Sequence, residues 1–251
     1  MRFHVIIPAR YASRRLPGKA LLDIGGKPMI GRVIECAQRS EAESVAVATD
    51  DERIADAARE FGAKAVMTSR EHNCGAERID EAADALELDD RDIIVNVQGD
   101  EPDMPAALID QVARLIAQKP LASMATAAAP LNAAQLRQPS VVKVVCDRDG
   151  YALLFSRAAV PWTSGEDISG GGGASGGADI ARRHLGIYAY RREYLRRFTK
   201  MGGCELERRE KLEQLRALWH GDKIACADAV EAPSAGVDTR ADLERVRRNF
   251  A

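Results

Sequence analysis

The sequence predicts a doubly wound α/β protein with a mostly parallel sheet, and three observations support this fold class. Strand-like and helix-like segments alternate from Phe3 to Ala128, which is the order that a parallel sheet with helical crossovers requires. The segment Asp92–Val97 is very apolar, as expected of a strand buried on both faces. With 251 residues, 46% of them hydrophobic, the chain can form one large domain, with or without a smaller lobe.

The elements of the first half each carry a local signal. The apolar run Phe3–Ile7 ends at Pro8, which lacks the amide needed to continue a sheet ladder. Pro28 stands where a helix can begin, and Thr49-Asp50-Asp51 can cap the helix through Ala58. Further strands are expected at Ser44–Ala48, Ala63–Met67, Asp92–Val97 and Leu121–Ala128. Further helices are expected at Glu77–Leu86 and Pro105–Gln118.

The alternation of strands and helices stops after Pro139, where strand-like segments follow one another without helices between them. We expect a single domain, 1–251, into which a β-rich lobe of roughly 139–200 is inserted. The glycine-rich tract between Ser164 and Asp179 has low complexity, and we expect a flexible connection or lid there. The strand-like segments are Val141–Cys146, Tyr151–Phe155 and His184–Tyr190, the first two joined by a hairpin turn at Asp147-Arg148-Asp149-Gly150. A helix, a strand and a terminal helix follow at Glu205–Trp219, Lys223–Ala229 and Ala241–Phe250.

Composition and charge exclude several classes of function. The net charge is −2, from 36 basic and 38 acidic residues, so there is no overall attraction to nucleic acid or to an anionic membrane. No apolar run reaches the roughly 18 residues of a spanning helix, and the N-terminus enters a strand without the apolar segment of a signal peptide. The five cysteines are scattered without metal-ligand spacing. They are typical of free thiols in a reducing cytoplasm.

A cationic loop directly follows the first strand. Arg10, Arg14, Arg15 and Lys19 lie within one short segment, with Gly18 beside the last of them. Such crowding is favourable when a polyanion lies among the cations, because guanidinium groups bind phosphate oxygens in pairs and lysine supplies a compact charge. The segment matches neither a Walker loop nor Gly-x-Gly-x-x-Gly. Its position after a strand favours triphosphate binding over the alternative, a solvated basic loop.

A second signal follows the buried strand, at Gln98-Gly99-Asp100-Glu101-Pro102. Ligands of open α/β sheets bind beyond the carboxyl ends of the strands. Asp100 would be repelled by a triphosphate there unless a cation intervened, and Mg²⁺ is commonly held by one or two carboxylates plus phosphate oxygens. We therefore expect Asp100 to be a metal ligand, the alternative being a turn-forming Asp after Gly. Gln98 can donate and accept, and could fix a substrate hydroxyl or carbonyl.

Three weaker signals have ordinary structural alternatives. Asp238 precedes the terminal helix and could be a second metal ligand or an N-cap residue. His184 and Tyr188 fall on one face of a strand, where they could bind a hydroxylated substrate or be part of the core. Glu207, Glu210 and Glu213 share a helix face at i, i+3 spacing. They could meet sugar hydroxyls, although a solvated, salt-bridged helix is the default.

Taken together, these motifs resemble those of the 3-deoxy-manno-octulosonate cytidylyltransferases, also called CMP-Kdo synthetases. The resemblance runs nearly from end to end of the chain. Its motifs are Ile7-Pro8-Ala9-Arg10-Tyr11-Ala12-Ser13, Leu16-Pro17-Gly18-Lys19, Val95-Asn96-Val97-Gln98-Gly99-Asp100-Glu101-Pro102, Arg183-His184-Leu185-Gly186-Ile187-Tyr188, Leu212-Glu213-Gln214-Leu215-Arg216 and Gly236-Val237-Asp238-Thr239.

The resemblance implies a Rossmann-like nucleotidyltransferase fold with a distinct activity. That activity is transfer of CMP from CTP to the 2-hydroxyl of 3-deoxy-D-manno-octulosonate (Kdo), with release of pyrophosphate. The resemblance also implies dependence on Mg²⁺, a homodimer, a role in lipopolysaccharide synthesis, and a β-rich lobe that serves the sugar side and dimerisation. Within the same reaction class, another acid sugar such as 8-amino-Kdo or sialic acid is an alternative, and a CTP-binding module without catalysis is another.

The resemblance also assigns residues to roles. The nucleotide-binding set is Pro8, Ala9, Arg10, Arg15, Lys19, Gly75 and Arg78. The sugar-binding set is Gln98, His184, Tyr188 and Glu210, and the metal-binding pair is Asp100 and Asp238. The catalytic set is Lys19, Arg10 and Asp100.

Three departures from the family pattern concern the nucleotide and sugar sides. Arg14 adds a cation where the family usually has Thr, and Cys74-Gly75-Ala76 replaces the usual Ser-Gly-Thr. The second change removes two hydroxyl groups near the expected nucleotide pocket. The glycine tract between Ser164 and Asp179 also looks looser than the corresponding family segment.

Overall fold

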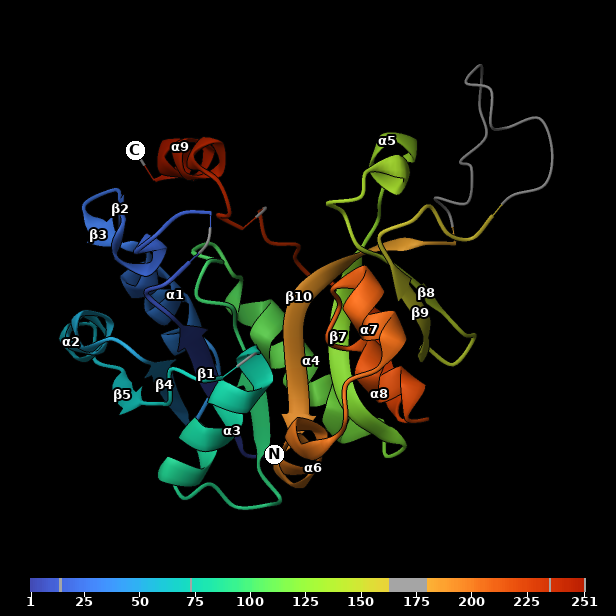
Figure 1. The fold of residues 1–251 in the computed structure, drawn as a ribbon, viewed down its shortest axis with the longest axis horizontal. Coiled ribbons are helices and arrows are strands. Elements are labelled where there is room, and N and C mark those ends of the chain that lie inside the picture. The colour runs from blue at the N-terminus through green and yellow to red at the C-terminus, as the bar shows by residue number, and fades with distance from the viewer. Residues whose placement is uncertain (14, 73, 163–179, 235, 251) are drawn as a thin grey trace.

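A mixed β-sheet forms the centre of the molecule, and helices cover both of its faces (Figure 1). The computed structural model describes residues 1–13, 15–72, 74–162, 180–234 and 236–250. The expectations for Arg14 and for the tract between Ser164 and Asp179 therefore lie outside the described residues. Within the described part of the chain, nine strands join in one sheet. They are β1 (Phe3–Ala9), β4 (Ser44–Thr49), β5 (Lys64–Met67), β6 (Ile93–Asn96), β7 (Ala122–Ala129), β8 (Lys143–Cys146), β9 (Ala152–Ser156), β10 (Arg182–Arg191) and β11 (Lys223–Asp228).

The sheet is parallel at both ends and antiparallel near its middle. Its main order is β11-β7-β10-β6-β1-β4-β5. Strand β1 pairs in parallel with β4 and β6, β4 with β5, and β7 with β11. Strand β10 runs antiparallel to both of its neighbours, β6 and β7. The predicted α/β class is confirmed, and the carboxyl ends of β1, β4 and β6 meet at one edge.

The helices of the described residues are α1 (Met29–Gln38), α2 (Glu52–Glu60), α3 (Gly75–Ala85), α4 (Ala106–Gln118), α5 (Ala133–Arg137), α6 (Arg192–Lys200), α7 (Glu205–Glu210), α8 (Leu215–Trp219) and α9 (Arg240–Asn249). Most of them lie in two layers, each over its own hydrophobic core, whereas α5 and α9 pack on two smaller clusters. Apolar residues of α1, α2 and α4 form one core against the sheet, and those of α3, α6 and α8 form the other. Strand β1 serves both cores by alternation, since Val5 and Ile7 belong to the first and Ile6 to the second. In the described residues, no helix has the length and apolar character needed to cross a bilayer.

The structure differs from the expected elements in the second half of the chain. The predicted helix Glu205–Trp219 is two short helices, α7 and α8, because Lys211 adopts a left-handed backbone with φ 56° that ends α7. Helices α5 and α6, a 3₁₀ turn (Lys19–Leu21) and a small hairpin of β2 (Asp23–Ile24) and β3 (Lys27–Pro28) were not expected. Helix α6 directly follows β10 and packs beside α3 (Figure 1).

The range 139–200, expected as an inserted lobe, contributes to two different parts of the fold. Strands β8 and β9 form a hairpin that joins the sheet through the start of β10. An isolated bridge from Tyr151 to Ala225 also brings this hairpin to β11. Strand β10 and helix α6, in contrast, belong to the main layers. The boundaries of the lobe, and its role in dimerisation and sugar binding, stay predictions.

Candidate active site

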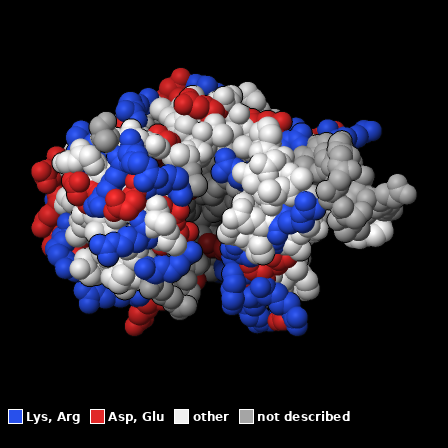
Figure 2. Space-filling view, turned by 90° about the horizontal axis from the view of Figure 1, so that it is seen from above, with Lys and Arg blue, Asp and Glu red and all other residues white. Residues whose placement is uncertain are grey.

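A cavity of about 390 Å³ lies beyond the carboxyl ends of β1 and β6. Figure 2 looks onto this edge of the sheet and shows a surface hollowed between its two halves. Many of the residues predicted from sequence line the cavity: Pro8, Ala9, Arg10, Arg15, Lys19, Gly75, Arg78, Gln98, Asp100 and Asp238. Ser13, Ala20, His72, Cys74 and Gly99 complete its lining. The predicted nucleotide and metal residues therefore share one cavity, together with Gln98 of the sugar set.

The cationic loop is folded around the main chain of Tyr11. The Tyr11 carbonyl accepts hydrogen bonds from the amides of Ser13 and Gly18, at 2.9 and 3.0 Å. Gly18 has φ 69°, and a Cβ atom there would lie 3.1 Å from the Tyr11 ring. Glycine is therefore required at this position for both reasons. The turn places Lys19 at the start of a 3₁₀ helix with its side chain in the cavity.

Lys19 bridges the two carboxylates that were predicted to bind a metal. Its Nζ lies 2.5 Å from Asp100 Oδ2 and 3.4 Å from Asp238 Oδ1. The Arg15 guanidinium also pairs with Asp238 Oδ1, at 2.7 Å. The amide of Val237 donates to the Asp100 carbonyl at 2.9 Å, which joins the segment before α9 to the loop after β6. Residues far apart in sequence are thus held together by charge and by the backbone.

A third carboxyl group lies behind this pair. Glu101 is half-buried, and its loss of contact with water, together with the neighbouring Asp100 charge, raises its pKa to about 8. A Cβ atom on Gly236 would lie 3.0 Å from Glu101 Oε1, so the approach of the two loops is close. Among the described residues there is no cluster of three or more side chains with metal-ligand chemistry. Two hard carboxylate donors beside a phosphate cavity nevertheless fit Mg²⁺, which takes its remaining ligands from phosphate oxygens and water.

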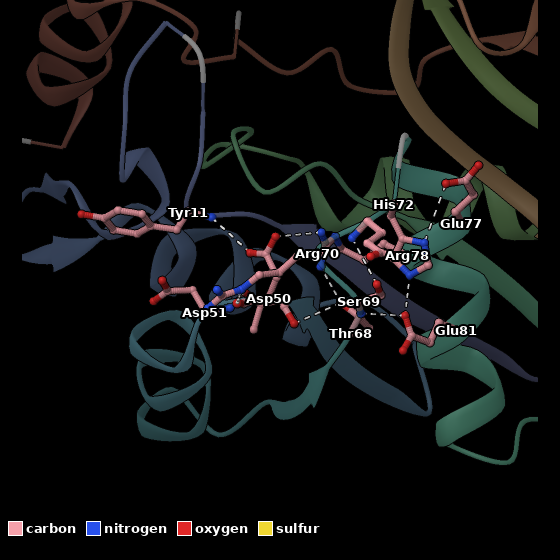
Figure 3. Close-up of polar contacts among 12 residues, drawn as sticks. Tyr11, Asp50, Asp51, Thr68, Ser69, Arg70, His72, Glu77, Arg78 and Glu81 are labelled. Atoms are coloured by element: carbon pink, nitrogen blue, oxygen red, sulfur yellow. Dashed lines mark hydrogen bonds and ion pairs between the residues drawn. The ribbon is translucent and has the colours of Figure 1, made fainter.

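Arg78 and His72 also line the cavity, and Figure 3 shows their polar contacts. The guanidinium of Arg78 pairs with Asp50 Oδ2 at 3.0 Å and donates to Thr68 Oγ1. His72 Nε2 contacts the Glu81 carboxylate, and its Nδ1 lies 3.7 Å from Glu77 Oε2. His72 was not predicted from the sequence, since a single histidine in a loop has no spacing that marks it.

Three of the four residues predicted for the sugar lie together at β6 and β10. Gln98 Nε2 donates weakly to the Gly186 carbonyl of β10 at 3.5 Å. The rings of His184 and Tyr188 stand 5.4 Å apart, and His184 Nε2 lies 3.1 Å from Thr126 Oγ1. Gln98 reaches the nucleotide cavity, whereas His184 and Tyr188 lie beyond its lining.

Glu210, the fourth, is held elsewhere. Its carboxylate accepts from Ser156 Oγ at 2.6 Å and from the Arg157 amide at 2.9 Å, both at the end of β9. The sugar-binding prediction for Glu210 gains no support from this geometry.

Glu213, which shares the i, i+3 pattern of Glu210, and its neighbour Gln214 suit a sugar contact better than Glu210 does. The break at Lys211 turns them inward, and Glu213 Oε1 and Gln214 Nε2 are buried without hydrogen-bond partners in the described structure. Burial raises the pKa of Glu213, while a hydrogen bond from the Cys74 thiol acts in the opposite direction. Buried polar atoms without partners are uncommon in folded proteins and call for a ligand or water. The motif that contains both residues was visible in the sequence, but the break in the helix was not.

His184 gives a testable pH dependence of stability. Burial lowers the pKa of His184 to about 3, against 6.5 in the unfolded chain, so below pH 6.5 the unfolded state binds a proton that the folded state does not. We expect the unfolding free energy to fall with decreasing pH between 6.5 and about 3, at a limiting slope of about 1.4 kcal/mol per pH unit from this group. Denaturant titrations of His184→Gln should lack this component.

The exposed His220 supplies the matched control for this measurement. The His220→Gln variant should retain the slope of the parent protein. Parallel stability curves for the parent and His184→Gln would contradict the prediction.

The fold and the cavity define a class of protein. A mixed α/β sheet with a cationic loop after its first strand, facing two carboxylates at the same edge, is the arrangement of a Rossmann-like nucleotidyltransferase. The profile of the Cytidylyltransferase family matches residues 4–224. The chain belongs to this family, within the group of 3-deoxy-manno-octulosonate cytidylyltransferases.

Close relatives support this assignment. A 3-deoxy-manno-octulosonate cytidylyltransferase of Pseudomonas fluorescens is 54% identical over 98% of this chain and 97% of its own length. One from Idiomarina loihiensis is 49% identical over 99% of this chain and 98% of its own length. A solved structure of CMP:2-keto-3-deoxy-manno-octonic acid synthetase complexed with CTP superposes with a TM-score of 0.88 at 38% identity, covering 100% of this chain and 98% of that one.

Proposed function

We infer that the chain transfers a cytidylyl group from CTP to Kdo and releases pyrophosphate. This inference rests on one observation: Lys19 pairs with Asp100 and Asp238, and all three side chains line a single cavity. The names of the relatives supply the nucleotide and the sugar, since nearly the whole chain aligns with them.

The chemistry is an in-line displacement at the α-phosphorus of CTP. The 2-hydroxyl oxygen of the sugar forms a bond to this phosphorus, and the bond to the bridging oxygen of pyrophosphate breaks. Because phosphoryl transfer depends mainly on positioning and on stabilising charge, no covalent intermediate with the protein is required. We propose that Arg10, Arg15 and Lys19 bind the phosphates and offset the charge that develops on pyrophosphate.

We propose that Asp100 and Asp238 hold Mg²⁺. Bound there, the ion would neutralise phosphate oxygens and lower the pKa of the sugar hydroxyl. Lys19, which joins the two carboxylates in the free protein, would then be released toward the phosphates. This exchange of partners keeps the two carboxylates neutralised both before and after the substrate enters.

For the sugar, we propose a site built from Gln98, His184 and Tyr188, extended by Glu213 and Gln214. The unpartnered buried atoms of the last two residues suit a ligand rich in hydroxyl groups. The contact of Cys74 with Glu213 lies between this site and the nucleotide cavity. Cys74, which replaces the family's usual serine, therefore lies where the two substrates would meet.

We further propose a cytoplasmic homodimer. The cysteines of the described chain are free thiols, which suits a reducing compartment. Leu153 in β9 and Trp162 are 62% and 76% exposed, and large exposed apolar side chains are typical of contact surfaces. Light scattering of the purified protein would report its mass in solution.

The test of function is pyrophosphate release from CTP and Mg²⁺, with and without Kdo, beside ATP, GTP and UTP. We expect release only when CTP and Kdo are both present. Faster release with 8-amino-Kdo or sialic acid than with Kdo would identify a different sugar substrate for the same reaction. Thermal stabilisation by Mg-CTP without release on any sugar would contradict catalysis and leave a binding module.

A further inference from the structure

Asp50 directly follows β4 and contacts both Tyr11 of the cationic loop and Arg78, which lines the cavity (Figure 3). Its Oδ1 accepts from the Tyr11 amide at 3.4 Å, and its Oδ2 pairs with Arg78 Nη2 at 3.0 Å. Its carbonyl oxygen accepts from Arg70 Nε at 3.3 Å. The Asp50 side chain is only 12% exposed and is not part of the cavity lining. It therefore acts on groups that line the cavity without being placed to touch a ligand there.

On one side, Asp50 fixes Arg78. The Arg78 side chain is 5% exposed and still reaches the cavity. In the described structure it also donates to Thr68, whose hydroxyl and amide both donate to the Thr49 carbonyl, at 3.0 and 2.8 Å. A buried guanidinium needs an opposite charge, because an unpaired buried charge is strongly unfavourable. Asp50 supplies that charge and also limits the directions in which Arg78 can point.

On the other side, Asp50 fixes the cationic loop. The Tyr11 carbonyl anchors the turn that leads to Gly18 and Lys19. The Tyr11 ring packs against Gly18 and lies under the Arg53 guanidinium, 3.6 Å from its centroid. Because the amide of Tyr11 donates to Asp50, a shift of this carboxylate would move both the loop and Arg78.

We propose that Asp50 is a positioning residue that couples the phosphate-binding loop to Arg78 and so sets the affinity for CTP. This proposal rests on the proposed function for the identity of the nucleotide. Asp50→Asn keeps an oxygen that can accept from Tyr11 but removes the charge opposite Arg78. We expect the KM for CTP to rise by at least about tenfold, as for loss of one partner of a buried ion pair. The KM for Kdo and the kcat at saturating CTP should stay within about threefold, since neither substrate-contacting atoms nor the carboxylate pair are changed.

The exposed Asp56 of α2 offers a control. Its side chain is 70% exposed and pairs with Arg59 at 2.7 Å, and in the described structure it contacts neither Tyr11 nor Arg78. Asp56→Asn removes the same charge from the helix that follows Asp50, so its KM for CTP should match that of the parent protein. A rise in KM equal to that of Asp50→Asn would overturn the proposal, because the effect would then follow the local charge and not the contacts of Asp50.

A double-mutant cycle with Arg78→Met separates positioning from damage to the fold. In the double variant no buried guanidinium is left unpaired, so it should fold as well as Arg78→Met alone. If Asp50 acts through Arg78, its substitution should raise the dissociation constant of CTP much less in the Arg78→Met background. An equal rise in the dissociation constant in both backgrounds would overturn the proposal. So would an Asp50→Asn variant in which kcat and the thermal midpoint fall and both KM values rise together.

Calorimetric titration with Mg-CTP provides the dissociation constants without the sugar. If the parent protein binds CTP but does not use Kdo, the proposed function fails while the test of Asp50 remains valid. If the parent protein uses Kdo and the Asp50 variants bind CTP normally, the proposed function stands and the role of Asp50 fails.

Discussion

Asp100→Asn should lower kcat by about 10² to 10³-fold, in line with removal of a single group that stabilises transition-state charge. Asp100 is 28% exposed and pairs with Lys19 at 2.5 Å. Its replacement removes one of the two carboxylates proposed to hold Mg²⁺ and frees Lys19 from its nearest partner. Pyrophosphate release at saturating CTP and Kdo measures the effect. The thermal midpoint without ligands should change little, because the side chain faces the cavity and not the core.

A control for this variant lies in the same loop. Asp103 is exposed and outside the cavity lining, so Asp103→Asn should retain the activity of the parent protein. An Asp100→Asn variant with near-normal turnover would rule out a metal-binding or charge-stabilising role. Loss of activity accompanied by a large fall in the thermal midpoint would instead point to a structural role for this carboxylate.

Arg192→Met should destabilise the fold by about 3 kcal/mol, the lower end of the range for breaking a buried ion pair. Arg192 is fully buried at the start of α6 and pairs with Asp80 and Asp84 of α3. Asp80 is largely buried, and the hydroxyl of Thr199 also donates to it at 2.7 Å. The substitution keeps much of the volume but leaves Asp80 without its cation. Denaturant titration measures the change in unfolding free energy.

Arg196 is the matched control because it also joins α6 to α3, but at the surface. It is 37% exposed and pairs with Asp84 and Asp90 at 3.1 and 2.7 Å. Arg196→Met should cost about 0–1 kcal/mol, as for other exposed ion pairs. Equal effects of the two substitutions would mean that burial does not determine the value of these ion pairs.

The first half of the fold followed from the sequence because its signals are local. The apolar runs Phe3–Ile7 and Asp92–Val97 marked two strands, and parallel order then placed their carboxyl ends at one edge. The first strand was expected to end at Pro8, but β1 continues through Pro8 to Ala9. The proximity of Lys19 to Asp100 is a consequence of that order, and the structure brings them together as expected. The family and the fold class are confirmed, whereas the roles of the individual site residues stay predictions.

The second half of the fold was harder to predict from the sequence because its decisive features depend on tertiary packing. Helix α6 is rich in charged residues, and its buried arginine at position 192 finds its partners only on α3. The i, i+3 spacing of the glutamates suggested one continuous helix, but Lys211 ends it in a left-handed conformation. As a result, Glu207 pairs with Arg216, Glu210 binds the end of β9, and Glu213 turns inward. Three carboxylates with one sequence pattern thus have three environments.

The place of β10 in the sheet has a consequence for synthesis of the protein. This strand lies between β6 and β7, although it follows both along the chain. Proteins emerge from the ribosome with the N-terminal part first. The edges of β6 and β7 that pair with β10 therefore stay unpaired until residue 191 has been synthesised, and such edges favour aggregation. Asp238 emerges later still, so the cationic loop lacks this acidic partner until residue 238 has been synthesised. A nascent chain of this protein therefore brings together the residues proposed for catalysis only when its two halves have joined.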